Sequence, residues 1–313
     1  MIHTFVIDSI THHTLVRGKA AAPVLLFVQA GPGFPLIHEA DALERTLHLE
    51  QNFRVVYWDQ RGTGRSFDPR DTGTLSIERL VDDLSALVEA LCRTLDVTAL
   101  DVIGLSLGGS LATLAATRPG HRIRSVLAVG PDIDIDESER FAWSFARDEA
   151  TRRGHRRALR ELDAIGQPPH DTAERFMTRV KWVTNFGGIV VGASFRGLFL
   201  RLVRRLILSP HYSLRQLVGA LRGMLATQAR VLSSLSHFSL PARVGRLEVP
   251  LTLAQGRLDA AAPPSLAQSF IDQLDAPAGK RLVWFDACAH SPHVEAPDAF
   301  RALVLETFRP ATF

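Results

Sequence analysis

The chain has 313 residues, 46% of them hydrophobic, so it can bury a substantial core in one domain and still carry a large insertion. Its two cysteines, Cys92 and Cys288, exclude a disulfide framework and a zinc site of the CxxC type. The formal net charge of +3 is modest, and we expect no nucleic-acid partner.

The first 18 residues alternate apolar and polar side chains, which predicts a pair of strands. They lack the charged start, apolar stretch and small-residue cleavage site of a signal peptide. No run of about 18 residues is apolar and uncharged enough to span a bilayer. Together with the scarcity of cysteine, these features predict a soluble, cytoplasmic protein.

Short apolar runs rich in β-branched and aromatic residues alternate with helical patterns over the first 131 residues. The runs cover 24–29, 53–59, 100–106 and 124–130, and apolar residues recur at helical spacing from Ile77 to Leu91. This alternation is typical of a parallel sheet covered by helices.

The alternation stops after Pro131, and helical periodicity replaces it for more than a hundred residues. Strand signals return at 249–256 and 281–286, each followed by a helical pattern. We therefore predict one α/β core domain, formed by 1–131 and 248–313, that is interrupted by a helical cap at 132–247.

The cap has an uneven charge. From Arg175 to Leu247 there is no Asp or Glu, while twelve Lys and Arg residues contribute +12, which leaves −9 for the rest of the chain. Such a bias indicates either an anionic partner or the solvated faces of amphipathic helices, and the sequence does not separate the two.

One basic segment of the cap, 195–207, has an amphipathic pattern. A helix lying on a membrane surface has this pattern. Packing of a cap over a hydrophobic pocket is the more ordinary explanation, so we favour it and keep membrane contact as the minor alternative. The apolar face would hold Phe195, Leu198, Phe199, Leu202, Val203 and Leu206, and the other face Arg201, Arg204 and Arg205.

The segment Gly104 to Gly108 matches G-x-S-x-G between a predicted strand and a helical stretch. In a nucleophile elbow the turn is crowded, so small residues are needed two positions on either side of the serine. The turn would expose the Ser106 hydroxyl and aim the Leu107 N–H at a developing oxyanion. A glycine-rich turn with a chance serine is the alternative.

A serine hydroxyl needs a base to take its proton, and the base needs a further acceptor to orient it. Asp259 follows the strand signal at 249–256, and His290 follows the one at 281–286, in the chain order expected after such an elbow. Asp286 and His293 are competing candidates. Placement just beyond a strand end favours Asp259 with His290.

A glycine-proline turn, Gln29 to Gly33, ends the first central strand, and its Gly31 N–H is the candidate second oxyanion donor. A non-functional turn would look similar. We expect Gln29, Ala30 and Leu105 to line the substrate pocket. The chemistry requires neither a metal nor an organic cofactor.

These segments resemble the α/β-hydrolases that are similar to proline iminopeptidases. The family's HGGPG loop corresponds to Gln29 to Gly33, its DQRGxGxS segment to Asp59 to Ser66, its elbow to Gly104 to Gly108, and its GHSPHxExP signature to the stretch that includes His290 to Pro297. The resemblance covers roughly 20–130 and 248–310. It implies an α/β-hydrolase fold, supports the Ser106, His290 and Asp259 assignment, and gives Arg61 and Ser66 a structural role.

The chain departs from the family at the site. Gln29 and Ala30 replace the family's His and Gly, and Leu105 and Leu107 stand where the peptidases tend to have Gly and Trp. The peptidases hold the substrate's ammonium with cap glutamates, whereas here acidic residues occur only in the first part of the cap, from Asp132 to Glu174.

We therefore predict a hydrolase for a small ester, lactone or amide, with an iminopeptidase-type aminopeptidase acting on short peptides as the first alternative. Acyl transfer, carbon–carbon bond hydrolysis and lyase chemistry reuse the same three residues and stay open. A non-catalytic ligand-binding protein of the same fold is the remaining alternative. The sequence leaves the oligomeric state open.

Overall fold

The computed structural model describes residues 1–31, 33–73 and 75–308. Within them, eight strands form a single sheet in the order β1-β2-β4-β3-β5-β6-β7-β8. The β1–β2 and β2–β4 pairs are antiparallel, and all other pairs are parallel. The strands are β1 (Ile2–Ile7), β2 (Ile10–Arg17), β3 (Val24–Val28), β4 (Arg54–Asp59), β5 (Leu100–Leu105), β6 (Ile123–Val129), β7 (Leu251–Gly256) and β8 (Lys280–Phe285).

Helices cover both faces of the sheet, which is why the central strands are apolar throughout. In β3, Val24, Leu26 and Val28 pack on the face that holds α2, α3 and α9, whereas Leu25 and Phe27 pack on the face that holds α1 and α11. The core helices are α1 (Ala40–Leu47), α2 (Ile77–Leu95), α3 (Leu107–Ala115), α9 (Pro264–Gln273), α10 (Pro292–Glu295) and α11 (Pro297–Thr307), with short 3-10 turns η1 (Ile37–Glu39), η2 (Leu49–Gln51) and η3 (Gly64–Ser66).

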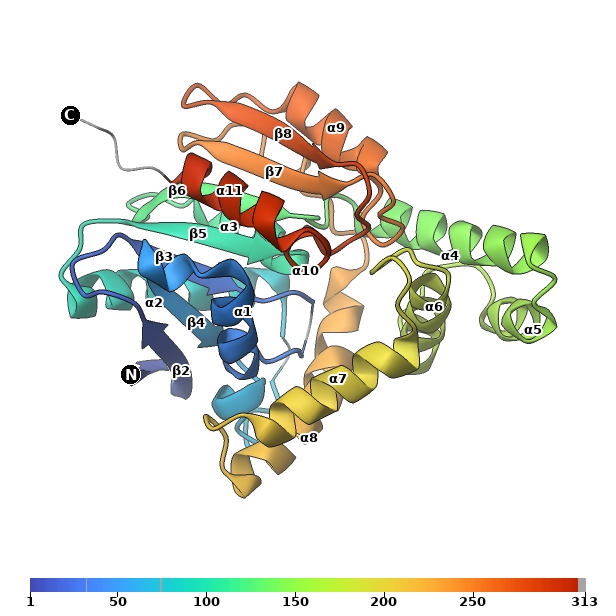
Figure 1. The fold of residues 1–313 in the computed structure, drawn as a ribbon, viewed down its shortest axis with the longest axis horizontal. Coiled ribbons are helices and arrows are strands. Elements are labelled where there is room, and N and C mark those ends of the chain that lie inside the picture. The colour runs from blue at the N-terminus through green and yellow to red at the C-terminus, as the bar shows by residue number, and fades with distance from the viewer. Residues whose placement is uncertain (32, 74, 309–313) are drawn as a thin grey trace.

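Five helices separate β6 from β7 along the chain. Figure 1 shows them gathered beyond the edge of the sheet toward which β5 and β7 point. An apolar cluster joins α4, α5 and α6, and it includes Ala260 from the loop after β7. The helices are α4 (Ile135–Arg152), α5 (Arg156–Ile165), α6 (Ala173–Asn185), α7 (Phe195–Leu208) and α8 (Leu214–Leu235).

The predicted α/β class is confirmed, and each predicted strand begins and ends within two residues of its observed bounds. The division into a core domain and a cap domain stays a proposal, which the position of α4 to α8 supports. In the part of the chain that the structure describes, no helix is long and apolar enough to cross a membrane.

The basic segment of the cap forms α7 as expected, but its apolar face is only partly covered. Leu206 is buried, Phe195, Leu198, Leu202 and Val203 are half-buried, and Phe199 is 50% exposed. Arg205 forms an ion pair with Glu39 of the core. The helix therefore packs loosely over the core and does not seal a pocket with all of its apolar residues.

Candidate active site

Ser106 lies in a strained turn between β5 and α3. Its φ of 50° and ψ of −124° are in a region that residues with a side chain rarely adopt. The turn is held by hydrogen bonds from the Ser106 N–H to the Val129 carbonyl (2.8 Å) and from the Gly109 N–H to the Ser106 carbonyl (2.8 Å). Such strain persists only where the surrounding structure enforces it.

The glycines of the motif are required by close backbone approach. A Cβ at Gly104 would collide with the backbone of Gly108 and Gly109, and one at Gly108 would collide with the carbonyl oxygens of Val28 and Gln29. The second contact brings the loop after β3 directly against the elbow, as the prediction for the second oxyanion donor requires.

Three predicted side chains form one hydrogen-bonded chain. His290 Nε2 lies 3.0 Å from Ser106 Oγ, and His290 Nδ1 lies 2.8 Å from Asp259 Oδ2. The Asp259 side chain is fully buried, and the imidazole is 13% exposed. A hydroxyl, an imidazole and a carboxylate in this order can pass a proton from the alcohol to the base while the acid fixes the ring.

The Asp259 carboxylate is anchored on three sides. Its Oδ1 accepts hydrogen bonds from the N–H groups of Ala261 and Ala262, both at 2.8 Å. Its Oδ2 accepts one from Gln255 Nε2 at 2.9 Å besides facing His290. Gln255 was missed by the sequence analysis, because nothing in its local pattern separates it from any polar residue near a strand end.

Glu295 holds the loop that carries His290 in place through hydrogen bonds to the backbone. Its carboxylate accepts hydrogen bonds from the N–H groups of Ala289 (3.1 Å) and Ser291 (3.2 Å), on either side of the histidine. It also accepts one from the N–H of Val191, in the segment between α6 and α7 (2.8 Å). Glu295 belongs to the signature that carried the family resemblance, and here its role is to position the loop.

The same segment of the cap holds both loops of the site by its backbone. The N–H of His290 donates to the Ile189 carbonyl (3.0 Å), and the N–H of Ala260, next to Asp259, donates to the Gly188 carbonyl (2.9 Å). Residues 188–191 therefore connect the acid loop and the base loop, which are separate in sequence.

Gly130, at the end of β6, is in contact with the imidazole. Its φ is +51°, and a Cβ there would lie 3.0 Å from His290 Nδ1 and 3.2 Å from Asp259 Oδ2. Any side chain at this position would therefore be strained and would press on the imidazole and on its carboxylate partner.

Asp132, two residues beyond Gly130, adds a carboxyl group that the sequence analysis did not select as a site residue. Its backbone is fixed by a hydrogen bond from Ser110 Oγ to its carbonyl (2.7 Å). Burial and the nearby Asp259 raise the pKa of Asp132 to about 6, against the opposing effects of His290, Arg179 and a hydrogen bond with Ser106. The rule that strand ends carry site residues, applied to β6, would have found it.

The charges around His290 outweigh its burial. Burial alone lowers the pKa of the imidazole, but Asp259, through both its charge and its hydrogen bond, and then Asp132 and Glu295, raise it to about 9. The protonated form of His290 is therefore the stable one at neutral pH.

The competing candidates lie elsewhere. Asp286 is exposed and pairs with Arg257 (2.6 Å). His293 lies one turn further on and packs against Phe300. Burial and the charge of His290 lower the pKa of His293 to about 4, so it is uncharged at neutral pH.

The roles of Leu107 and Gly31 as oxyanion donors stay predictions. Leu107 is the first residue of α3, so its N–H is among those that a helix leaves without an intrahelical acceptor. Gly31 has a φ of +58°, and Pro32 lies outside the described residues.

The predicted pocket residues differ from one another in exposure. Ala30 is half-buried, whereas Gln29 and Leu105 are in the interior. The Gln29 side-chain oxygen faces the Gln60 N–H and the Thr63 hydroxyl at 3.4 Å, and Leu105 packs within the core. A lining role stays a prediction for all three residues, and the Gln29 side chain also contacts the loop after β4.

The segment from Asp59 to Ser66 is a scaffold, as the resemblance implies. Asp59 Oδ1 accepts hydrogen bonds from the N–H groups of Leu36 (2.8 Å) and Ile37 (2.9 Å), just beyond the Gln29 to Gly33 loop. Arg61 forms a buried ion pair with Asp83 (2.6 Å), and the Ser66 hydroxyl donates to the Asp59 carbonyl (2.6 Å).

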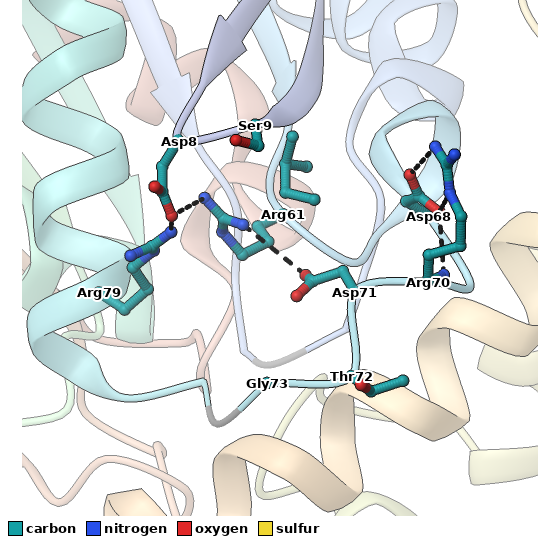
Figure 2. Close-up of a pocket in the computed structure, with 10 residues that line it drawn as sticks. Asp8, Ser9, Arg61, Asp68, Arg70, Asp71, Thr72, Gly73 and Arg79 are labelled. Atoms are coloured by element: carbon teal, nitrogen blue, oxygen red, sulfur yellow. Dashed lines mark hydrogen bonds and ion pairs between the residues drawn. The ribbon is translucent and has the colours of Figure 1, made fainter.

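A cavity of about 580 Å³ lies away from Ser106, between the β1–β2 turn and the loop after η3. Figure 2 shows that its charged groups face one another: Arg61 faces Asp71 (3.8 Å) and Asp8 (4.0 Å), Arg79 pairs with Asp8, and Arg70 pairs with Asp68 (2.7 Å). With its arginines already paired, this cavity has the chemistry of a structural ion-pair network. Among the described residues, no group of three or more His, Cys, Asp or Glu side chains could hold a metal ion.

The chain matches the family model described as alpha/beta hydrolase fold over residues 23–297, and so belongs to that family. It is a hydrolase of the α/β-hydrolase superfamily. It is 24% identical, over 89% of this chain and 86% of the relative, to a probable aminopeptidase, YbaC, of Bacillus subtilis (strain 168).

Two solved structures share the fold. A proline iminopeptidase from Mycobacterium smegmatis has a TM-score of 0.67 at 21% identity, covering 98% of this chain and 97% of its own. The esterase RhEst1 from Rhodococcus sp. ECU1013 has a TM-score of 0.61 at 18% identity, covering 97% of each chain. The expected resemblance to α/β-hydrolases similar to proline iminopeptidases is thus confirmed.

The charges around His290 give a prediction that does not depend on activity. In the protein labelled with ¹⁵N-histidine, NMR should show His290 titrating near pH 9. Replacing Asp132 with Asn should lower that midpoint, because the Asp132 charge favours the imidazolium. The control Asp286→Asn removes an exposed carboxylate paired with Arg257 and should leave the midpoint unchanged. An unchanged midpoint in Asp132→Asn would contradict the assignment.

Proposed function

We propose that the protein is a serine hydrolase that cleaves a small ester, lactone or amide through an acyl-enzyme intermediate. The observation that carries this proposal is the chain of hydrogen bonds from Ser106 to His290 to Asp259, with Ser106 held in the strained turn. A strained serine that contacts an oriented base is the arrangement that nucleophilic acyl transfer requires.

In the first half of the reaction, Ser106 Oγ attacks the substrate carbonyl while His290 Nε2 takes the hydroxyl proton. The N–H groups of Leu107 and Gly31 bind the oxyanion of the tetrahedral intermediate. When the intermediate collapses, His290 gives its proton to the leaving alcohol or amine, and the acyl group stays on Ser106. Asp259 accepts from His290 Nδ1 throughout and stabilises the imidazolium.

In the second half, His290 takes a proton from a water molecule, whose oxygen attacks the acyl-enzyme carbonyl. Collapse of this second intermediate returns the proton to Ser106 Oγ and releases the acid. The base acts as the neutral imidazole, so kcat/KM rises with pH toward the His290 pKa of about 9.

The proposed nucleophile predicts covalent labelling. A fluorophosphonate probe should form an adduct with the wild-type protein at Ser106, located by mass spectrometry of the digested protein. Ser106→Ala should abolish labelling and lower ester hydrolysis by about four orders of magnitude or more, which leaves only the contribution of binding and the oxyanion donors. Labelling of the intact protein at another residue, or none at all, would favour the non-catalytic binding protein.

The contact between Gly130 and the imidazole predicts a second effect. Gly130→Ala should lower kcat by about a hundredfold, because displacement of the base by a fraction of an ångström disturbs the proton transfer. Gly120→Ala is the matched control: Gly120 also has a positive φ, of +69°, but no atom lies within 4 Å of a Cβ built there. The control introduces the same backbone strain without a contact to His290. A similar loss of kcat in both variants would mean that strain, and not displacement of the imidazole, causes the effect.

A second candidate function is an aminopeptidase of the proline iminopeptidase type, and one observation favours it. The ammonium of an aminoacyl substrate needs a carboxylate partner in a partly dry site. Asp132 places a carboxyl group close enough to Ser106 and His290 for both to affect its pKa. Glu139, another acidic residue of the cap, already forms an ion pair with Arg179 (2.6 Å), so Asp132 is the better candidate to hold the ammonium.

A substrate panel decides between the two candidates. We expect Ser106-dependent hydrolysis of short p-nitrophenyl esters to exceed that of proline arylamides, since the cap is apolar and basic. The reverse order would support the aminopeptidase. In that case Asp132→Asn should raise KM for the arylamide relative to the ester, because only the arylamide carries an ammonium.

A further inference from the structure

Helix α8 carries an apolar stripe on the face that is turned away from the core. Leu214, Val218, Leu221 and Leu225 follow one another at spacings of four, three and four residues, so they share one side of the helix over about 16 Å. They are 83%, 50%, 39% and 71% exposed.

Helix α8 packs against the core through its opposite side. Gly223 is buried against the Gly62 carbonyl and Phe67, where a Cβ would have no room. The Thr227 hydroxyl donates to the same Gly62 carbonyl at 2.7 Å. The stripe is therefore not the side by which the helix is attached to the protein, and burial in this chain does not explain its leucines.

Positive charge accompanies the stripe. Arg215 and Arg222 lie along one edge of it and are exposed. Neither has a carboxylate within 4 Å among the residues that the structure describes. The whole stretch from Arg175 to Leu247 contains no acidic residue.

Helix α7 repeats the pattern on its own outer side. Leu200, Ile207 and Leu208 are 56%, 59% and 65% exposed. Arg201 and Arg204 lie between them and are exposed too. Figure 1 shows α7 along the lower side of the cap and α8 rising from the lower end of the view toward the core, with residues 209–213 joining the two helices.

We propose that the outer face of α7 and α8 docks on an anionic lipid surface. Exposed leucines flanked by unpaired arginines on the solvent side of a helix are the arrangement of an interfacial helix: the apolar side chains enter the boundary of the acyl chains, and the guanidinium groups meet lipid phosphates. A second copy of this chain that docked through the same face would bring the same positive charge to the contact, so charge complementarity favours the anionic surface over a symmetric dimer of these faces.

Sedimentation of the full chain with lipid vesicles tests the proposal. We expect binding to vesicles of phosphatidylcholine and phosphatidylglycerol in equal amounts, and little to phosphatidylcholine alone. Binding should weaken strongly in about 1 M salt, where the Debye length is about 3 Å. Because the assay measures partitioning and not hydrolysis, its outcome is independent of the proposed chemistry.

Two variants separate the charged and apolar contributions. Arg215→Gln with Arg222→Gln should lower the partition coefficient about 30-fold, since each arginine near an anionic surface contributes a factor of about five. Leu214→Ser with Leu225→Ser should lower it about tenfold or more. All four residues are exposed, so circular dichroism and hydrolysis of a short ester should match the wild type.

Matched control variants on other surfaces test whether vesicle binding depends on α8. Arg147→Gln with Arg152→Gln removes two exposed arginines of α4 that are paired with Asp163 and Glu149. Val6→Ser removes an apolar side chain of β1 that is 75% exposed. Neither should change binding. Absence of vesicle binding, binding regardless of lipid charge, equal losses in the controls, or a dimer in light scattering that Leu214→Ser with Leu225→Ser dissociates would each overturn the proposal.

Discussion

The arrangement of the site depends on one constraint, the strained backbone of Ser106. A φ of 50° at a residue with a side chain is unfavourable by about 1–3 kcal/mol, so neighbouring contacts must enforce it. They do so because Gly104 and Gly108 have no side chain, so the backbones of β5, α3 and the loop after β3 can pack directly against one another. The close packing that enforces the strained turn also places the elbow against the start of the loop after β3.

Convergence at one edge of the sheet makes the rest of the site possible. β5, β6, β7 and β8 are parallel neighbours, so the loops that carry Ser106, Gly130, Asp259 and His290 all begin at the same edge. Backbone hydrogen bonds from the cap segment 188–191 then connect the acid loop to the base loop. The cap is therefore part of the support of the site, and loosening that segment is expected to disturb His290 before it disturbs the sheet.

The sequence predicted what depends on local pattern and chain order. The strands, the elbow and the candidates Ser106, Asp259 and His290 follow from apolar periodicity and from residues that directly follow strands. Asp132 was within reach of the strand-end rule, because it lies just beyond β6. Gln255 and Glu295 act through contacts with loops, so their roles depend on tertiary neighbours. The outward face of α8 was also beyond reach, because an apolar stripe indicates a buried side and does not tell which side the protein leaves uncovered.

Negative and positive charges occupy different places in the molecule: carboxylates surround His290, and arginines lie on the outer side of α7 and α8. Around His290 the charged neighbours are the carboxylates of Asp259, Asp132 and Glu295, which favour the imidazolium that forms when a serine is deprotonated. On the outer side of α7 and α8 the charged groups are arginines. The main charges that act on the pKa of His290 are those of Asp259, Asp132 and Glu295, and none of them is an arginine of the outer face. Arginines can therefore accumulate on α7 and α8 without removing the preference for a protonated base.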